Sequence, residues 1–163
     1  MPTQTTPHTT QDPIPSPEAC HRLLQAMGML PHIVDHSRQV CRVAQCLADA
    51  LIAVGAPIHR DLVTAAALLH DITKTRSLET GEDHAATGGA YLAERGYRRV
   101  SEIVRQHVTL DAYTDNGQPG EAEVVNYADK RVLHDVITDL KPRMAYIRER
   151  YGITEYHRER IAT

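Results

Sequence analysis

The sequence predicts an all-α helical bundle, and three observations lead to this fold class. Apolar residues recur at helical spacing through most of the chain, and no run alternates between apolar and polar residues as a surface strand would. Glycines and prolines divide the chain into segments of helical length. Phe and Trp are absent, so Ala, Leu, Val and Ile must build the core, and this composition favours helices.

Length and charge exclude several classes of protein. A chain of 163 residues suits one core, and we expect a disordered tail over residues 1–16 and a single domain over 17–163. A net charge of −3 without an extended basic segment argues against binding to long nucleic acid. No apolar stretch approaches the ~18 residues of a membrane span, and the cysteine spacing indicates reduced thiols. We expect a soluble cytoplasmic protein, and the oligomeric state is not predicted.

The first two helices are delimited by prolines and glycines. Ser16 suits the N-cap of a short first helix, with a proline at the first helical position. A long second helix should run from Pro31 to about Val54. One face of this helix combines His36 with aliphatic residues, which are Ile33, Val40, Val43 and Leu47.

The third helix should run from Arg60 to about Thr73, and it is apolar nearly all round, so it should lie at the centre of the bundle. It ends with His70 and Asp71, whose burial is costly unless a partner such as a divalent cation binds them. The polar stretch over residues 74–82 contains a glycine and is expected to be a loop at the mouth of a site.

The fourth and fifth helices each bring one further histidine to an apolar face. The fourth is expected from about Asp83 to Arg95, with His84 in its first turn. A pair of glycines in this helix allows another helix to approach closely. The fifth helix is expected over residues 98–108, with His107 in its buried stripe.

The sixth helix is expected from about Glu121 to Leu140, after a turn-rich loop. Asp129 takes the place of a hydrophobic residue in its apolar stripe. A carboxylate at such a position must be paired, neutralised or bound to metal. A last, partly apolar segment begins at Pro142.

Sorting polar residues by helix face selects four histidines and two aspartates, which are His36, His70, Asp71, His84, His107 and Asp129. A lone histidine on an apolar face is more often hydrogen-bonded to a carbonyl group, but six such residues together indicate a buried metal site. Nitrogen and oxygen ligands of this kind suit divalent transition metals, Fe or Mn first, and Zn, Co or Ni as well. Six protein ligands exceed the need of one catalytic metal, so we expect two ions that share Asp71.

The segment Ala-Ala-Leu-Leu-His-Asp-Ile-Thr-Lys, residues 66–74, resembles the signature of the HD-domain metal-dependent phosphohydrolase superfamily. In that superfamily an upstream His, the His-Asp pair and a downstream Asp bind metal, and His36 and Asp129 match the outer two positions. The resemblance covers about residues 31–140 and implies an HD-domain helical bundle around a buried metal site. His84 and His107 resemble the extra histidines of binuclear members, which include the bacterial symmetric dinucleoside tetraphosphate hydrolases. Members specialised for cyclic dinucleotides usually carry a His-His pair, whereas Val108 follows His107 here. The sequence therefore argues against this subclass.

The resemblance implies hydrolysis of a nucleotide, or of a related phosphate ester or phosphoanhydride, by metal-activated water. Asp71 and Lys74 would be the catalytic residues, and Lys74 and Lys130 would bind the phosphate of this small substrate. Arg76 and Arg38 are weaker candidates for phosphate, and Tyr113 for stacking on a base. Two other functions remain open. One is a mixed-valent di-iron oxygenase, because some HD-like proteins use the same six ligands, and the other is a non-catalytic regulatory module.

Overall fold

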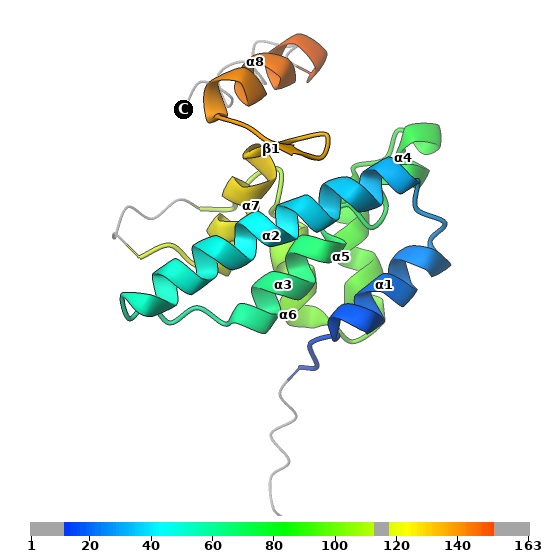
Figure 1. Cartoon of the computed structure of the whole chain (residues 1–163). Helices are drawn as coiled ribbons and strands as arrows, with labels where there is room; N and C mark the ends of the chain where they lie inside the picture. The colour runs from blue at the N-terminus through cyan, green and yellow to red at the C-terminus, as the bar shows by residue number, and fades with distance from the viewer. Residues whose placement is uncertain (1–11, 113–117, 152–163) are drawn as a thin grey trace, which may run out of the picture.

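The chain folds into the all-α bundle that the sequence predicts (Figure 1). This computed structural model describes residues 12–112 and 118–151. Its helices are α1 (Pro17–Ala26), α2 (Pro31–Ala53), α3 (Arg60–Leu69), α4 (Lys74–Thr80), α5 (His84–Glu94), α6 (Arg98–Val104), α7 (Glu121–Lys130) and α8 (Leu140–Tyr151). A short antiparallel hairpin, β1 (Val132–Leu133) and β2 (Val136–Ile137), connects α7 to α8.

Helix α3 lies at the centre of this bundle, as its composition predicts. All its residues from Leu62 to Leu69 are buried, and it packs against α1, α2, α6 and α7. Figure 1 shows the long helix α2 lying across it. The core is aliphatic, as the absence of Phe and Trp requires. Leu69 and Ile72, both fully buried, flank the His70-Asp71 pair, so the packing of α3 carries this pair into the interior.

Local capping determines where the helices begin. The side chain of Asp83 accepts hydrogen bonds from the backbone N–H groups of Ala85 at 3.0 Å and Ala86 at 3.2 Å. These bonds satisfy two donors of the first turn, so α5 begins at His84. Ser16 caps α1 in the same way, as its position in the sequence predicts.

Helices α5 and α6 approach closely at the predicted pair of glycines. A Cβ atom added to Gly89 would lie 2.8 Å from the Cβ of Arg105 and 3.3 Å from the carbonyl oxygen of Ser101. The hydroxyl of Ser101 also donates a hydrogen bond of 2.7 Å to the carbonyl oxygen of Gly89. The middle of α5 and the second half of α6 are therefore held close together, and a predicted ligand lies at the start of α5 and another just after α6.

Residues 74–82, which we expected to form a loop, instead contain helix α4 over Lys74–Thr80. Lys, Arg, Leu and Glu are all good helix formers, and Gly81 ends the helix with a left-handed backbone at φ 71°. No residue of α4 is buried, and a short exposed helix has the same polar composition as a loop. The prediction of a loop was wrong for this reason.

The predicted fifth helix ends earlier than expected. Helix α6 ends at Val104 rather than near Val108, and His107 lies in the turn that follows. The backbone carbonyls of Gln106 and His107 accept hydrogen bonds from the side chain of Asn126 in α7. This tertiary contact satisfies two carbonyls beyond the end of α6, and hydrophobic periodicity does not reveal such a contact.

The predicted sixth helix also ends early, because α7 stops at Lys130 and the chain enters the hairpin. Val132 pairs with Ile137 across the two strands, and β-branched residues of this kind favour extended structure. His134 adopts a left-handed backbone with φ 57°, which is the conformation that a tight hairpin turn needs. Val136, which the predicted helix would include, lies in β2 and is 61% exposed.

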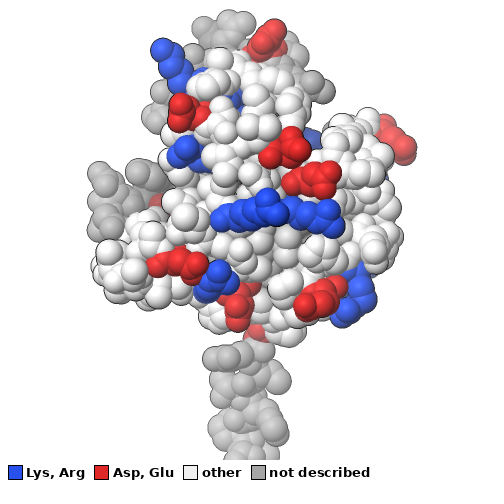
Figure 2. Space-filling view, in the orientation of Figure 1, with Lys and Arg blue, Asp and Glu red and all other residues white. Residues whose placement is uncertain are grey.

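Both ends of the chain extend beyond the described residues. Residues 1–11 of the predicted tail lie outside them, whereas Ile14 packs against the core and Pro15 is buried. The division into a tail over residues 1–16 and one domain over 17–163 stays a prediction. On the face shown in Figure 2, Lys and Arg are interspersed with Asp and Glu and form no continuous basic area. Within residues 12–112 and 118–151, no helix combines the length and the apolar composition needed to cross a bilayer.

Candidate metal site

The structure brings the six predicted ligand residues together inside the bundle. They come from α2 (His36), the end of α3 and the turn after it (His70 and Asp71), the start of α5 (His84), the turn after α6 (His107) and the last turn of α7 (Asp129). Their side chains are at most 18% exposed, and that of His70 is fully buried. Residues far apart in the sequence thus form one buried polar cluster within an aliphatic core.

Asp71 lies between two groups of histidines. Its Oδ1 atom is 3.2 Å from Nε2 of His84 and 3.4 Å from Nε2 of His107. Its Oδ2 atom is 3.4 Å from Nε2 of His70. The two oxygens of one carboxylate therefore face different histidines, which is the arrangement that a carboxylate shared by two cations requires.

Asp129 lies close to two histidines on one side of Asp71. Its Oδ1 atom lies 2.9 Å from Nε2 of His36 and 3.5 Å from Nε2 of His70. The rings of the two histidines have centroids 5.3 Å apart. We call His36, His70 and Asp129 the first half-site.

The second half-site consists of His84 and His107, whose ring centroids are 5.1 Å apart. The ring of His107 also lies edge-on to that of His70, with 5.0 Å between centroids. The two half-sites are thus adjacent, and Asp71 faces both of them.

Three of the histidines direct a lone pair at the carboxylates. Their Nδ1 atoms lie 2.5–2.7 Å from backbone carbonyl oxygens, in the pairs His36 with His134, His70 with Ala67, and His107 with Val104. A carbonyl oxygen only accepts hydrogen bonds, so each Nδ1 carries a proton, and Nε2 either carries the lone pair of a neutral ring or, without a cation, takes up a second proton that faces the carboxylates. Nε2 of His70 is fully buried and has no hydrogen-bond partner among the described residues. A lone pair that faces a carboxylate is repelled unless a cation lies between them, so these imidazoles fit the role of metal ligands.

Both carboxylates stay ionised in this buried place. Burial alone would raise the pKa of Asp71, but the charge of His70 and hydrogen bonds from the surrounding histidines hold it well below its usual value. Burial would likewise raise the pKa of Asp129, and the neighbouring imidazoles of His36 and His70 hold it well below its usual value. Two buried negative charges need positive partners.

The buried histidines respond to these charges in opposite directions. Burial alone would lower the pKa of His70, but Asp71 and Asp129 raise it well above its ordinary value. Burial dominates at His107, where it lowers the pKa despite the attraction of Asp71. A divalent ion would supply the positive charge that His70 otherwise takes up as a proton.

The donor atoms fit a divalent metal in two overlapping groups that share His70. The ligand atoms of His36, His70 and Asp129 lie within 4.8 Å of one another. The same holds for the ligand atoms of His70, Asp71 and His107. Imidazole nitrogens combined with carboxylate oxygens suit transition metals such as Fe, Mn and Zn.

The two lysines predicted to bind phosphate lie beside the metal ligands in the sequence. Lys74 is the first residue of α4, follows Asp71 by three residues and is partly exposed. Lys130 follows Asp129 and is partly buried, and burial lowers its pKa although Asp129 opposes this effect. The Nζ atom of Lys130 lies 2.6 Å from Oδ1 of Asn126.

The two weaker arginine candidates form ion pairs with residues other than the six ligands. Arg76 forms an exposed ion pair with Glu82 at 2.5 Å, and Arg38 forms one with Asp35 at 3.2 Å. Tyr113 lies outside the described residues.

Sequence reasoning missed two residues that hold ligands in place. Thr73 is fully buried, and its hydroxyl donates a hydrogen bond of 2.8 Å to the carbonyl oxygen of His84. Asn126 donates its amide to the carbonyl oxygen of His107 at 2.9 Å. Asn126 lies three residues before Asp129 on the same helix face, so the rule that buried polar groups need partners would have found it.

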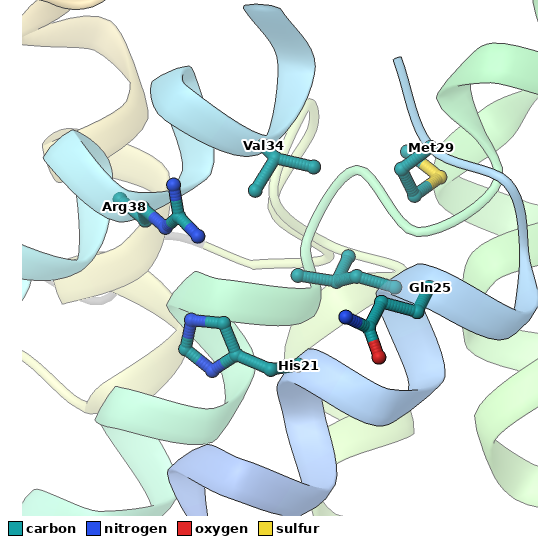
Figure 3. A pocket seen from close by; sticks show the side chains of 6 residues that line it. His21, Gln25, Met29, Val34 and Arg38 are labelled. Carbon is teal, nitrogen blue, oxygen red and sulfur yellow. The ribbon is translucent and has the colours of Figure 1, made fainter. Parts of the chain in front are cut away.

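A separate hollow of about 100 Å³ lies between α1 and α2 (Figure 3). It is lined by His21, Leu24, Gln25, Met29, Val34 and Arg38. None of the six candidate ligands belongs to this lining, so the hollow is separate from the metal site.

Comparison with known proteins places the chain in a family. Residues 33–132 match the family model described as HD domain. A tRNA (cytidine(56)-2'-O)-methyltransferase of Picrophilus torridus is 31% identical over 144 residues, which are 80% of this chain and 40% of that protein. An enzyme of the same name from Thermoplasma volcanium is 35% identical over 96 residues, 58% of this chain and 26% of that protein. The dihydroneopterin 2',3'-cyclic phosphate phosphodiesterase of Methanocaldococcus jannaschii is 31% identical over 138 residues, 76% of this chain and 54% of that protein.

The chain spans between about a quarter and about half of the length of these curated relatives. No solved structure matches it. The family match covers more than half of the chain and includes His36, the His70-Asp71 pair and Asp129. The chain therefore belongs to the HD domain family.

Proposed function

We propose that this protein is a metal-dependent phosphohydrolase that acts on a small phosphorylated substrate, a nucleotide or a related phosphate ester or phosphoanhydride. The observation that carries the proposal is the convergence of six metal-ligand side chains around Asp71, whose two oxygens face different histidines. Membership of the HD domain family and similarity to a phosphodiesterase support hydrolysis of a phosphate bond. The proposal follows the phosphodiesterase rather than the methyltransferases because clustered metal ligands serve hydrolysis directly.

In this proposal each half-site would hold one divalent transition-metal ion, and Asp71, which faces both half-sites, would be shared by them. The ligands suit Fe, Mn, Zn, Co and Ni, of which we propose Fe or Mn. Such ions supply a nucleophilic water at neutral pH and neutralise charge on the phosphoryl oxygens. The ligand set resembles that of the binuclear HD members, so dinucleoside tetraphosphates belong among the first substrates to test.

Two lysines of the chain would hold the phosphate. The backbone N–H of Lys74 donates to the carbonyl oxygen of Asp71 at 2.8 Å, so this side chain begins directly beside the bridging residue. An ammonium group there can bind a non-bridging phosphate oxygen or the leaving group. Lys130 has three N–H donors, and its two contacts with Asn126 leave one for the substrate.

Metal analysis combined with a substrate screen tests the proposal. The screen measures phosphate release or bond cleavage with nucleotides, dinucleoside polyphosphates and cyclic nucleotides, including 2',3'-cyclic phosphates. We expect hydrolysis that stops on chelation and returns with Mn²⁺ or Fe²⁺, and none in Asp129→Ala. An oxygen-dependent reaction without phosphate release would instead identify the di-iron oxygenase. Bound metal without any reaction would identify the regulatory module.

A matched pair of variants tests the role of Lys74. Lys74→Ala should lower turnover by on the order of 10²–10³-fold and leave metal content intact, because the residue stabilises phosphoryl charge and does not hold the ions. Arg76→Ala should have little effect, since Arg76 is exposed and paired with Glu82. Steady-state kinetics and metal content of both variants provide the measurement, and unchanged turnover in Lys74→Ala would refute this role.

A further inference from the structure

The side chain of Asn126 joins α7 to the turn that carries His107. Asn126 is 9% exposed, and its Nδ2 atom lies 2.9 Å from the carbonyl oxygen of His107 and 3.3 Å from that of Gln106. On the other side, its Oδ1 atom lies 2.6 Å from Nζ of Lys130. The amide therefore connects a cation beside one half-site to the peptide that carries a ligand of the other.

The orientation of this amide follows from the chemistry of its neighbours. An ammonium group only donates hydrogen bonds, and carbonyl oxygens only accept them. Oδ1 of Asn126 must therefore face Lys130, and Nδ2 must face the two carbonyls. Lys130 thus favours the same amide orientation that the carbonyls of Gln106 and His107 require.

His107 needs this support because it lies outside regular helix. Helix α6 ends at Val104, and the carbonyls at a helix end lack partners within the helix. Asn126 donates to two carbonyls of the turn that follows, those of Gln106 and His107. The His107 ring is bonded through Nδ1 to the carbonyl oxygen of Val104, and it directs Nε2 at Oδ1 of Asp71, 3.4 Å away.

We propose that Asn126, oriented by Lys130, is a positioning residue for the second half-site, because it holds the peptide of His107 where the imidazole can bind metal. This inference rests on the two-metal centre of the proposed function. The effect of removing the amide should be selective. Asp129 of the first half-site lies on the same helix, but the buried apolar residues of α7 anchor that helix to the core independently of the amide.

Titration of the metal-free full-length chain with Mn²⁺ tests the inference. The wild type should bind two Mn²⁺ ions, and Asn126→Ala should weaken the second by about 10–100-fold while the first keeps its affinity. Asn126→Asp keeps the size of the side chain and an acceptor for Lys130 but replaces the donating amide. It should show the same selective loss, and because it leaves no cavity it separates the hydrogen bond from packing.

Glu123→Ala is the matched control on the same helix. The Glu123 side chain accepts a hydrogen bond of 2.6 Å from the backbone N–H of Gly120 and so caps the start of α7. This variant should lower the unfolding temperature and leave both Mn²⁺ affinities unchanged. The same pattern in the Asn126 variants would show that Asn126 supports only the helix, which overturns the inference.

Lys130→Met tests whether Lys130 orients the amide. Like Asn126→Ala, it should lower the affinity for the second Mn²⁺ ion, because the amide loses a group that favours its orientation. A change in KM alone, with both Mn²⁺ affinities intact, would overturn this step and assign Lys130 to the substrate.

The wild-type titration separates the failure of this inference from that of the proposed function. Fewer than two Mn²⁺ ions in the wild type would overturn the two-metal centre, and the inference with it. Two ions in the wild type, with affinities that are unchanged or equally weakened in both Asn126 variants, would overturn the inference alone.

Discussion

The two half-sites are built from different kinds of structure. In the first, His36 and Asp129 lie within α2 and α7, and His70 directly follows α3, all three helices packed on the core. In the second, His84 is the first residue of α5 and His107 lies in the turn after α6. Two ligands of the first half-site therefore lie inside helices that pack on the core, whereas the second half-site consists of the first residue of a helix and a residue in a turn.

The hydrogen bonds to the ligand backbones differ as well. The ring bonds do not, because Nδ1 of His70 and of His107 is bonded to a carbonyl of the preceding helix, and Nδ1 of His36 to the carbonyl of His134 in the hairpin. The carbonyl of His84 is held by Thr73, and the peptide of His107 by Asn126, so both depend on another segment of the chain. Helix ends and turns open at a lower free energy than helix interiors. The comparison indicates that the first half-site is formed by the core itself, and we expect the second to bind its metal more weakly.

A change at Asp71 should affect both half-sites equally, because its carboxylate faces both of them. Asp71→Asn removes this charge, so both metals should be lost and turnover should fall by about 10³-fold or more. Elemental analysis of the purified variant, with circular dichroism as the test of folding, provides the measurement. Asp61→Asn, at an exposed position in the first turn of α3, is the control and should retain both metals. Normal metal content in Asp71→Asn would rule out a bridging carboxylate.

Removing one ligand from each half-site should separate them. His107→Ala should leave one metal per chain, held by the first half-site. Asp129→Ala should abolish the tighter binding, because it removes one of the two buried charges and leaves at most the weaker ion. Metal content after dialysis measures both. If His107→Ala keeps full metal content while Asp129→Ala loses all of it, the site is mononuclear.

Chelation should destabilise the fold and act more strongly near the second half-site. Without cations, the buried carboxylates of Asp71 and Asp129 lose partners, which typically costs about 3–5 kcal/mol and is softened by protonation of His70. Urea unfolding with and without chelator measures this loss. Amide hydrogen exchange should rise more over residues 105–109 than in α3. Equal stability in both conditions would show that the cluster does not depend on metal.

The smallest effect is expected where α5 and α6 touch. Gly89→Ala places a Cβ 2.8 Å from that of Arg105, and overpacking of this kind costs about 1–3 kcal/mol. It should also weaken metal binding at the second half-site, because His84 begins α5 and His107 lies in the turn after α6. Gly88→Ala, where the nearest atom is Val104 Cγ1 at 3.3 Å, is the milder control. Thermal unfolding and Mn²⁺ titration compare the two variants. An equal loss of affinity for both Mn²⁺ ions in Gly89→Ala would contradict the proposed difference between the half-sites.

The sequence by itself determined the features that depend on local chemistry. The starts of α1, α2 and α5 follow from Ser16, Pro31 and Asp83, because capping and proline geometry act within a few residues. The candidate ligands followed from burial, since a polar residue on an apolar helix face, such as Asp129, requires a partner.

Only the tertiary structure decided which side chains meet and where helices give way to turns. The amide of Asn126 binds the carbonyls of the turn that carries His107, and the hairpin after α7 supplies the carbonyl of His134 that is bonded to His36. The two oxygens of Asp71 could be assigned to different histidines only in three dimensions. Hydrogen bonds between distant segments leave no periodic signal in the sequence, because each partner satisfies its local preferences equally well without the other.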